Sequence, residues 1–401
     1  MAAVSNNNTR VFYATQAVTI GGMGNVLDPV DSYDVGAGGS AGDTGAATIV
    51  HGLQSVGVDT NFNLEQAFEL GQLSLYENIE DIPDISVSMQ KFLDGYSLIY
   101  HLGASFDGDG NLITGTTLSG RADTRADVRL AINKTTDEQV SNGDSGVAEL
   151  YCSGMYMSSV SYTIPTDGTA TEDVTFVGNN KKWITDDGDS QLLLMSGGNM
   201  DAGFGSIFGS DEPNTTNNHV LRREDVNTSG DAAVNGYHTV MPTIIQGVTQ
   251  GGASFKGRQP SGAGFVDTNN VHINSFTCST DLGREQINQL GTRTPYNRYV
   301  TFPTEVTSTI EVTATAGDNV DAVETARTNL SNHEICVVLS DSTVLHLGKK
   351  NKVSSITYGG GDAGGGNATI TYNFSNFNDL VVLHTGDPVG ANANYWDDKF
   401  A

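Results

Sequence analysis

One acidic segment has a spacing that could bind a metal ion. Asp107, Asp109 and Asn111 occupy the first, third and fifth positions of a calcium loop. Leu112 stands where such a loop needs glycine, and Leu118 stands where it needs a bidentate glutamate. We therefore interpret the segment as a turn, with calcium binding left open.

The other candidates for chemistry are less specific. Asp186, Asp187 and Asp189 form an acidic cluster typical of a solvated loop, and the eight histidines have no His-x-x-x-His spacing. Gly203 and Gly205 neither follow a strand pattern nor open a helix, so they do not predict a phosphate-binding loop. No set of residues combines a nucleophile, a base and an oxyanion site. We expect no enzyme activity, no catalytic, cofactor-binding or metal-binding residues, and no cofactor.

The cysteines do not predict a disulfide framework. Cys152, Cys278 and Cys336 are three in number and lack the Cys-x-x-Cys spacing. We predict small buried or half-buried thiols.

Charge and hydropathy exclude further classes. The 401 residues include 47 Asp and Glu against 20 Lys and Arg, a net charge of -27. Such a chain repels the phosphate backbone, so sequence-specific DNA binding is not expected. Residues 1–10 show no signal-peptide pattern. Apolar runs such as 335–339 are far shorter than the ~20 residues of a membrane-spanning helix, so we expect a soluble chain or one anchored through partners.

Strand patterns dominate the chain. Segments rich in Val, Ile, Thr and Tyr lie between clusters of Gly, Asn and Asp. The predicted strands are 11–20, 85–91, 128–132, 157–164, 174–177, 299–302, 306–314, 335–339, 354–358, 368–374 and 380–384. With 48 glycines, this pattern predicts a mainly β fold built from sandwiches or barrels, with a few short helices and long loops.

Part of the sequence occurs twice. Residues 55–88 align without a gap onto 275–308 with nine identities in 34 positions, at an offset of 220. A second block, 158–162 and 174–176, matches 354–358 and 370–372 at an offset of 196. Repeated blocks in the same order indicate two tandem domains of similar fold.

The repeats suggest domain boundaries and helices. We expect a first β domain over 1–185, an arm of long loops over 186–264 that contacts another subunit, and the core of a second β domain over 265–401. The arm includes Arg222 and Arg223 beside Glu224 and Asp225.

Short helices are predicted at equivalent places in the two copies. One lies between Thr60 and Gly71, one between Thr280 and Gly291, and a further one over 318–330. The apolar face of the second helix would consist of Leu282, Ile287 and Leu290.

The second copy also resembles a known family over about 30 residues. The matching residues are Asp281, Leu282, Gly283, Arg284, Glu285, Leu290, Gly291, Pro295, Tyr296, Tyr299, Val300, Phe302, Pro303, Thr304, Glu305, Val306 and Thr307. This run resembles the major tail, or tail tube, proteins of tailed bacteriophages. The first copy departs from it with Leu64 in place of Arg284 and Leu75 in place of Pro295, which implies unequal contacts for the two copies.

The resemblance implies a structural virion protein of the tail, present in the host cytoplasm during assembly. Its domains would be tube-like β domains that join sheets around a ring, and the rings would stack into a hollow tube that DNA passes through during ejection. A duplicated chain would form a homotrimeric, pseudo-hexameric ring. Partners would be other copies and other tail proteins, such as the tape measure, the terminator and a sheath. Genomic DNA would pass an acidic lumen transiently without specific binding, and no membrane would be involved.

Two alternatives remain open from the residues alone. One is a carbohydrate-binding or adhesin-like β-rich protein of a virion or cell surface, although Trp183 and Trp396 lie in unrelated contexts. The other is a secreted β-hydrolase with a carboxylate pair. The sequence leaves open the host, the type of tail, the residues that face a lumen, and a trimeric or hexameric ring.

Overall fold

The computed structural model describes somewhat more than half of the chain as a mainly β structure. The described residues are 16–22, 48–71, 73, 75–96, 98–103, 117–121, 123–133, 146–185, 195–196, 199–200, 219–226, 239–242, 244–245, 259–261, 264–266, 272–292, 295–314, 332–341, 343–361 and 366–383. The acidic segments 107–111 and 186–189, the glycines at 203 and 205, the predicted helix 318–330 and Trp396 lie outside these residues.

The first half of the chain contributes ten strands. They are β1 (Gln16–Gly22), β2 (Thr48–Ile49), β3 (Leu53–Asn61), β4 (Leu64–Phe68), β5 (Leu75–Glu80), β6 (Asp84–Phe92), β7 (Ala126–Asn133), β8 (Gly146–Pro165), β9 (Thr171–Gly178) and β10 (Asn180–Thr185). The short helix α1 (Ile99–Leu102) and the 3₁₀ turn η2 (Ser119–Arg121) lie between β6 and β7.

The second half contributes a comparable set. Its larger strands are β15 (Ile273–Asp281), β16 (Arg284–Ile287), β17 (Asn297–Val300), β18 (Glu305–Thr313), β19 (Cys336–Val338), β20 (Val344–His346), β21 (Lys352–Gly359), β22 (Thr369–Phe377) and β23 (Val381–Leu383). Between the halves lie β11 (Met195–Ser196), β12 (Asn199–Met200), the 3₁₀ turn η3 (Arg223–Asp225), β13 (Gln259–Ser261) and β14 (Gly264–Val266).

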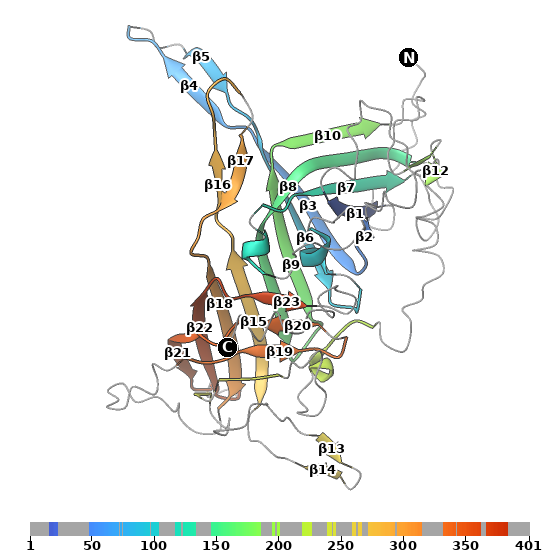
Figure 1. Cartoon of the computed structure of the whole chain (residues 1–401), viewed down its shortest axis with the longest axis vertical. Helices are drawn as coiled ribbons and strands as arrows, with labels where there is room; N and C mark the ends of the chain where they lie inside the picture. The colour runs from blue at the N-terminus through green and yellow to red at the C-terminus, as the bar shows by residue number, and fades with distance from the viewer. Residues whose placement is uncertain are drawn as a thin grey trace.

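A long antiparallel sheet organises the fold. Eight strands follow one another in the order β3-β6-β9-β8-β15-β18-β22-β21. Strand β8 is 20 residues long, so its second half belongs to this run while its first half pairs with β7 and β10 in a second layer. Strands β19, β20 and β23 cross the sheet in the same way over the second half (Figure 1).

The same topology occurs twice. The pairing order β3-β6-β9-β8 recurs as β15-β18-β22-β21, and the layer β7-β8-β10 recurs as β19-β20-β23. A register shift between Met157 and Ser159 has its equivalent between Val353 and Ser355. The repeat in the sequence therefore corresponds to a repeated arrangement of strands.

The strand registers correct the gapless alignment of the repeats. Thr60 pairs with Ile85, whereas Thr280 pairs with Val306, so β6 and β18 differ by 221 residues rather than 220. The extra residue lies in the loop 301–304, which is one residue longer than 81–83. A shift of one residue exchanges the two faces of a strand, so the gapless alignment would place buried residues opposite exposed ones.

The second block is also displaced. Val160 pairs with Val174, and its counterpart Ile356 pairs with Tyr372, so β9 and β22 differ by 198 residues rather than 196. This displacement is even, so it keeps each residue on its face.

The helices predicted after Thr60 and Thr280 are wrong. Both segments are strands that turn into antiparallel hairpins, β4 with β5 and β16 with β17. The glycines expected to stop the helices, Gly71 and Gly291, do have positive φ, but they lie at the hairpin tips. Ile287 and Leu290 are exposed while Leu282 is buried, so the three apolar residues share no common face.

The expected arm over 186–264 is only partly described, and several of its described residues are buried in the core of the chain. Leu221 is fully buried, and its backbone bonds to Leu93 and Ala170. Val240 pairs with Cys336 as a strand-like bridge, and Ile245 is fully buried. These parts complete the hydrophobic core of the chain itself.

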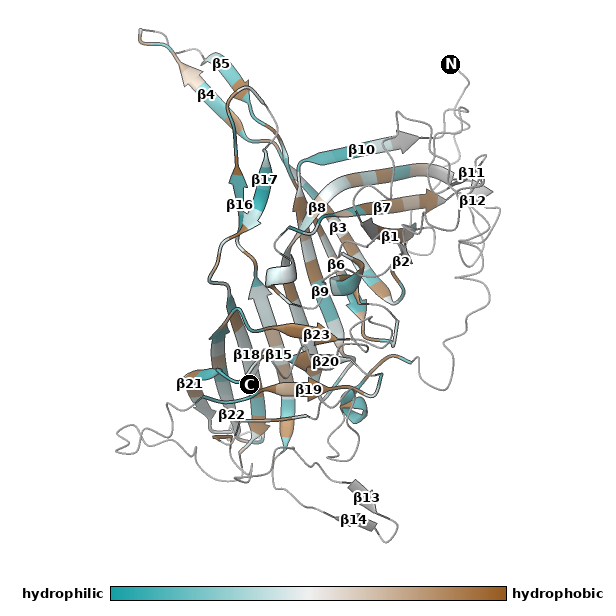
Figure 2. Ribbon diagram, viewed as in Figure 1, coloured by the Kyte–Doolittle hydropathy of each residue, from teal (hydrophilic) through white to brown (hydrophobic). Residues whose placement is uncertain are grey.

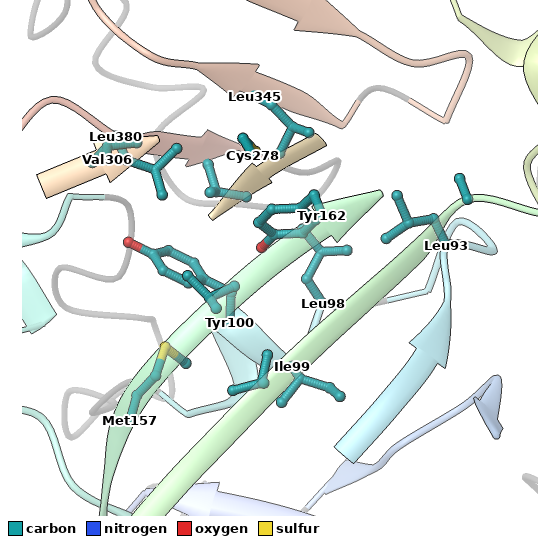
Figure 3. Packing of buried hydrophobic residues seen from close by; sticks show 14 of the residues in the cluster. Leu93, Leu98, Ile99, Tyr100, Met157, Tyr162, Cys278, Val306, Leu345 and Leu380 are labelled. Atoms are coloured by element: carbon teal, nitrogen blue, oxygen red, sulfur yellow. The ribbon is translucent and has the colours of Figure 1, made fainter. Parts of the chain in front are cut away.

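One hydrophobic core runs through both halves. Figure 3 shows Tyr162 of β8 near Cys278 of β15, with Leu98, Ile99 and Tyr100 from the α1 region. The opposite face of the long sheet carries Ser, Thr, Asn and acidic side chains, which produces the alternating colours of Figure 2. This alternation is what a sheet with one buried and one polar face requires.

A buried carboxylate anchors α1. Glu172 accepts hydrogen bonds from the amides of Ile99 and Tyr100 at 2.7 and 3.0 Å and from the Tyr162 hydroxyl at 2.9 Å. Burial raises the pKa of Glu172, although Lys91 and these three donors act to lower it. The repeat-equivalent position in β22 carries Ile370, so this anchor belongs to the first half alone.

We predict that Glu172→Ala lowers the free energy of unfolding by about 3 kcal/mol or more, because it leaves three buried donors unpaired at about 1–3 kcal/mol each. Asp173→Ala, on the polar face of the same strand, should change it by less than about 0.5 kcal/mol. Urea unfolding of both variants measures the difference. Equal stabilities would contradict the role of Glu172.

Candidate assembly surfaces

The two halves of the chain join through a pair of sheet edges. Strand β8 pairs with β15 over seven residue pairs, from Pro165 opposite Ser275 to Ser159 opposite Asp281. The amide of Leu282 extends the pairing by donating to the Ser158 carbonyl at 2.7 Å. Leu282 is fully buried there. The junction thus turns two four-stranded units into one continuous sheet.

The hairpin β16–β17 strengthens the junction. Arg284 donates from Nε to the Met157 carbonyl at 2.8 Å, and its guanidinium carbon lies 5.2 Å from the centre of the Tyr156 ring. The Tyr156 hydroxyl bonds to Asn297 on the other strand of the hairpin. Arg284, which the sequence marked as unequal to Leu64, therefore makes contacts between the halves that a leucine cannot make.

A second set of contacts surrounds Asp84, at the start of β6. Its Oδ1 accepts from Arg298 Nη2 at 2.5 Å and from Gln286 Nε2 at 2.6 Å, while its Oδ2 accepts from Asn63 at 3.1 Å. Asn179 also accepts from Arg298, at 3.0 Å. Partial burial alone would raise the pKa of Asp84, but the bonds from Asn63 and Arg298 and the charge of Arg298 hold it below its ordinary value.

Sequence reasoning missed these residues. Asp84 and Arg298 are separated by 214 positions and carry no local motif. The one sequence feature that pointed to this region was the difference between the equivalent positions Leu64 and Arg284, which begin the two hairpins.

The long sheet ends in two edges, β3 and β21. Within the described part of the chain, β3 pairs only with β6, and β21 pairs only with β22. By the repeat, β3 is the counterpart of β15 and β21 is the counterpart of the second half of β8. The two edges of the long sheet are therefore formed by the counterparts of the two strands that meet at the central junction.

Exposure confirms that the ends lack the cover that the junction provides. Tyr162 is 0% exposed at the junction, whereas its counterpart Tyr358 is 52% exposed on β21. Leu282 is 0% exposed, whereas its counterpart Phe62, beside β3, is 64% exposed. Large apolar side chains are thus left in solvent where the equivalent residues are packed. Unpaired strand edges with exposed apolar residues are templates for pairing with another chain.

The two hairpins form a further surface. Hairpin β4–β5 and hairpin β16–β17 extend beyond the same end of the long sheet (Figure 1). Their exposed apolar side chains, with the adjoining loop residues, are Phe62, Leu64, Phe68, Leu70, Leu73, Leu75, Tyr76, Ile79, Ile287, Leu290, Tyr296, Tyr299 and Phe302. Such a concentration of exposed apolar groups makes the two hairpins a candidate interaction surface.

The polar face of the long sheet is acidic. Strand registers place six carboxylates on it: Asp59, Asp84, Asp173, Asp281, Glu305 and Glu311. Among the described residues of these eight strands, Lys352 is the only Lys or Arg on this face. A hollow of about 540 Å³ crosses it, lined by small polar side chains together with Asp173 and Asp281.

The remaining candidates are distributed over the fold. Cys152, Cys278 and Cys336 are buried and unpaired with one another, as predicted, and burial raises the pKa of Cys152 and of Cys278 to about 12. Trp183 lies half-exposed on β10. Within the described residues, no three His, Cys, Asp or Glu side chains gather as a metal site would require. Over the same residues, none of the helices has the length and apolarity needed to span a bilayer.

The solved structures that resemble this chain include two components of one particle, both at a low TM-score. The cap that terminates the tube of the anti-feeding prophage aligns with 46% of this chain and 99% of its own length, at 12% identity and a TM-score of 0.26. A chain of the baseplate of the anti-feeding prophage aligns with 45% of this chain and 98% of its own length, at 8% identity and a TM-score of 0.28. No family model and no curated protein matches the sequence.

We predict that exposed leucines at the hairpin tips serve association rather than folding. The triple variant Leu70→Ser, Leu73→Ser, Leu290→Ser should unfold within about 0.5 kcal/mol of the wild type, because these side chains are exposed. Its self-association, followed by sedimentation velocity, should be reduced. Val220→Ser, an exposed apolar position outside the hairpins, is the matched control. Unchanged association of the triple variant would remove the hairpins from the interface.

Proposed function

We propose that this chain is the structural subunit of a hollow tube of the bacteriophage tail type. One observation carries the proposal: the central junction joins β8 to β15, and the two ends of the chain expose the counterparts of those strands. The edge of β21 on one chain is suited to β3 of the next in the way that β8 is suited to β15. An interface between two different surfaces repeats from chain to chain, so it closes into a ring where the rotation allows.

The duplication gives the symmetry of the proposed ring. Each chain supplies two similar four-stranded units, and the resemblance to tail tube proteins implies six such positions around the tube. Three chains then close a ring with true threefold and apparent sixfold symmetry. Closure pairs every edge of the long sheets, which removes the unpaired backbone donors and acceptors.

The two faces of the sheet have different roles in this ring. The apolar face is already covered by the second layers in each half, so the acidic, hydroxyl-rich face is the one available to line the bore. A wall of this charge offers no cations to neutralise phosphates, and DNA can pass without being retained.

The hairpins supply contacts along the tube. They leave the sheet at one end with their apolar side chains exposed, a position from which they reach the neighbouring ring rather than the neighbouring chain alone (Figure 1). Burying a large apolar side chain contributes about 1.5–3 kcal/mol, so several such residues per chain provide substantial stacking energy.

We expect purified protein to form rings and tubes in negative-stain images. Native mass spectrometry of single rings should give three chains, and averaged end views should show six similar lobes. Six chains per ring would contradict the pseudo-sixfold arrangement while leaving the tube intact. Monomers at all concentrations would contradict the proposed function.

The assembled protein should not retain duplex DNA in a gel-shift assay at low salt, because the proposed wall is acidic. The matched variant Asp59→Lys, Asp173→Lys, Asp281→Lys, altered on the polar face, should gain salt-sensitive retention. Tight binding by the wild type, lost as salt is raised, would contradict an acidic bore.

A further inference from the structure

We propose that the contact between neighbouring chains is an antiparallel pairing of β21 with β3 in one fixed register, closed by an ion pair between Lys352 and Glu77. The inference rests on the proposed function and adds the residues that recognise the second copy of this chain. It follows from mapping the central junction onto the two free edges.

The register follows from the equivalent strands. At the central junction Ser279 of β15 lies opposite Ser161 of β8. The neighbouring residue pairs continue the antiparallel pairing from this point. Strand β15 maps onto β3 with an offset of 220, and β8 maps onto β21 with an offset of 196. The equivalent pair is therefore Asp59 opposite Thr357 of the neighbouring chain. Val58 then lies opposite Tyr358, in the place of Cys278 and Tyr162.

Three residues that contact one another at the central junction are all replaced at the equivalent positions between chains, and the replacements are complementary in charge. At the central junction Tyr156 bonds to Asn297 and packs under the cation of Arg284. The three equivalent positions between chains carry Lys352, Glu77 and Leu64. A lysine side chain reaches about as far as tyrosine, so its ammonium is placed where the Tyr156 hydroxyl meets Asn297. An acidic residue at that point is complementary, and Leu64 removes the like charge that Arg284 would bring.

The contacts around Asp84 also differ at the equivalent position between chains, where the positive charge is lost from the hairpin. Asp84 accepts from Gln286 and Arg298 within the chain. The equivalent acceptor between chains is Glu305, which would face Gln66 and Asn78 of the neighbour. The amide donor is kept, and the cationic donor is lost.

Each junction consequently holds one ion pair, with opposite polarity. Within the chain, the hairpin carries the cation, Arg298, and the sheet carries the anion, Asp84. Between chains, the hairpin carries the anion, Glu77, and the sheet carries the cation, Lys352. Both Glu77 and Lys352 are exposed in the single chain, so they are accessible to a neighbour.

A charge exchange tests the ion pair. Glu77→Lys and Lys352→Glu should each raise the critical concentration for ring assembly about tenfold or more, since each places like charges together. The double variant should return to within about threefold of the wild type. Glu65→Lys is the matched control on the same hairpin, because its counterpart Glu285 remains exposed at the central junction. Failure of the double variant to recover would overturn the ion pair.

Cysteine cross-linking tests the register. Asp59→Cys with Thr357→Cys should form a disulfide between chains in assembled rings, because directly opposite residues satisfy disulfide geometry. Asp59→Cys with Ser355→Cys, displaced by two residues on the same face, should cross-link at least tenfold less. The native cysteines are buried and should stay unreactive in both variants.

The strand register and the ring can each be contradicted by a different result. Rings that form but cross-link through Ser355 would overturn the register and leave the tube subunit in place. Wild-type protein that forms no rings would overturn the proposed function itself.

Discussion

Unpaired backbone at the edges of a sheet is the constraint on which this structure depends. A strand edge leaves amides and carbonyls without partners, and a protein must cover it, charge it or pair it. The chain pairs one such edge internally, where β8 meets β15 over seven residue pairs. The burial of Tyr162 and Leu282 and the placement of the hairpin β16–β17 all follow from that pairing. The same constraint acts on β3 and β21, which lack an equivalent partner among the described strands.

Because the fold is duplicated, equivalent residues of the two halves can be compared within one chain. Most effects of assembly have to be inferred from an isolated subunit, but here one contact of the repeated kind is already formed. Side chains that the junction covers can be compared with counterparts that it does not cover, as with Tyr162 and Tyr358. This comparison separates residues that are buried within the single chain from counterparts that stay exposed at the unpaired edges.

Much of the fold could be predicted from strand patterns and internal repeats, because alternation and duplication are local or self-referential properties of a sequence. The helices near Leu282 and Leu64 were predicted wrongly, because the apolar residues there serve three surroundings: the junction, the hairpin and solvent. A helical spacing assumes a single buried face. The gapless alignment also missed the extra residue in the loop before β18. Matching residue types does not show which face of a strand is buried. The contacts of Asp84 with Arg298 depend on strands brought together from distant positions and have no local signature.

In the proposed ring, the central junction and the junction between chains differ for a physical reason, which is how each one forms. The partners of the central junction are tethered in one chain, so their effective concentration is high and the contact needs little intermolecular affinity. A junction between chains must instead recognise its partner from solution and fix an orientation, a task for which complementary charges are well suited. Deep apolar burial at Tyr162 and Leu282 suits the first requirement, because it stabilises the folded chain permanently. The exposed charges of Lys352 and Glu77 suit the proposed contact between chains, because charged side chains keep an unpaired strand edge soluble.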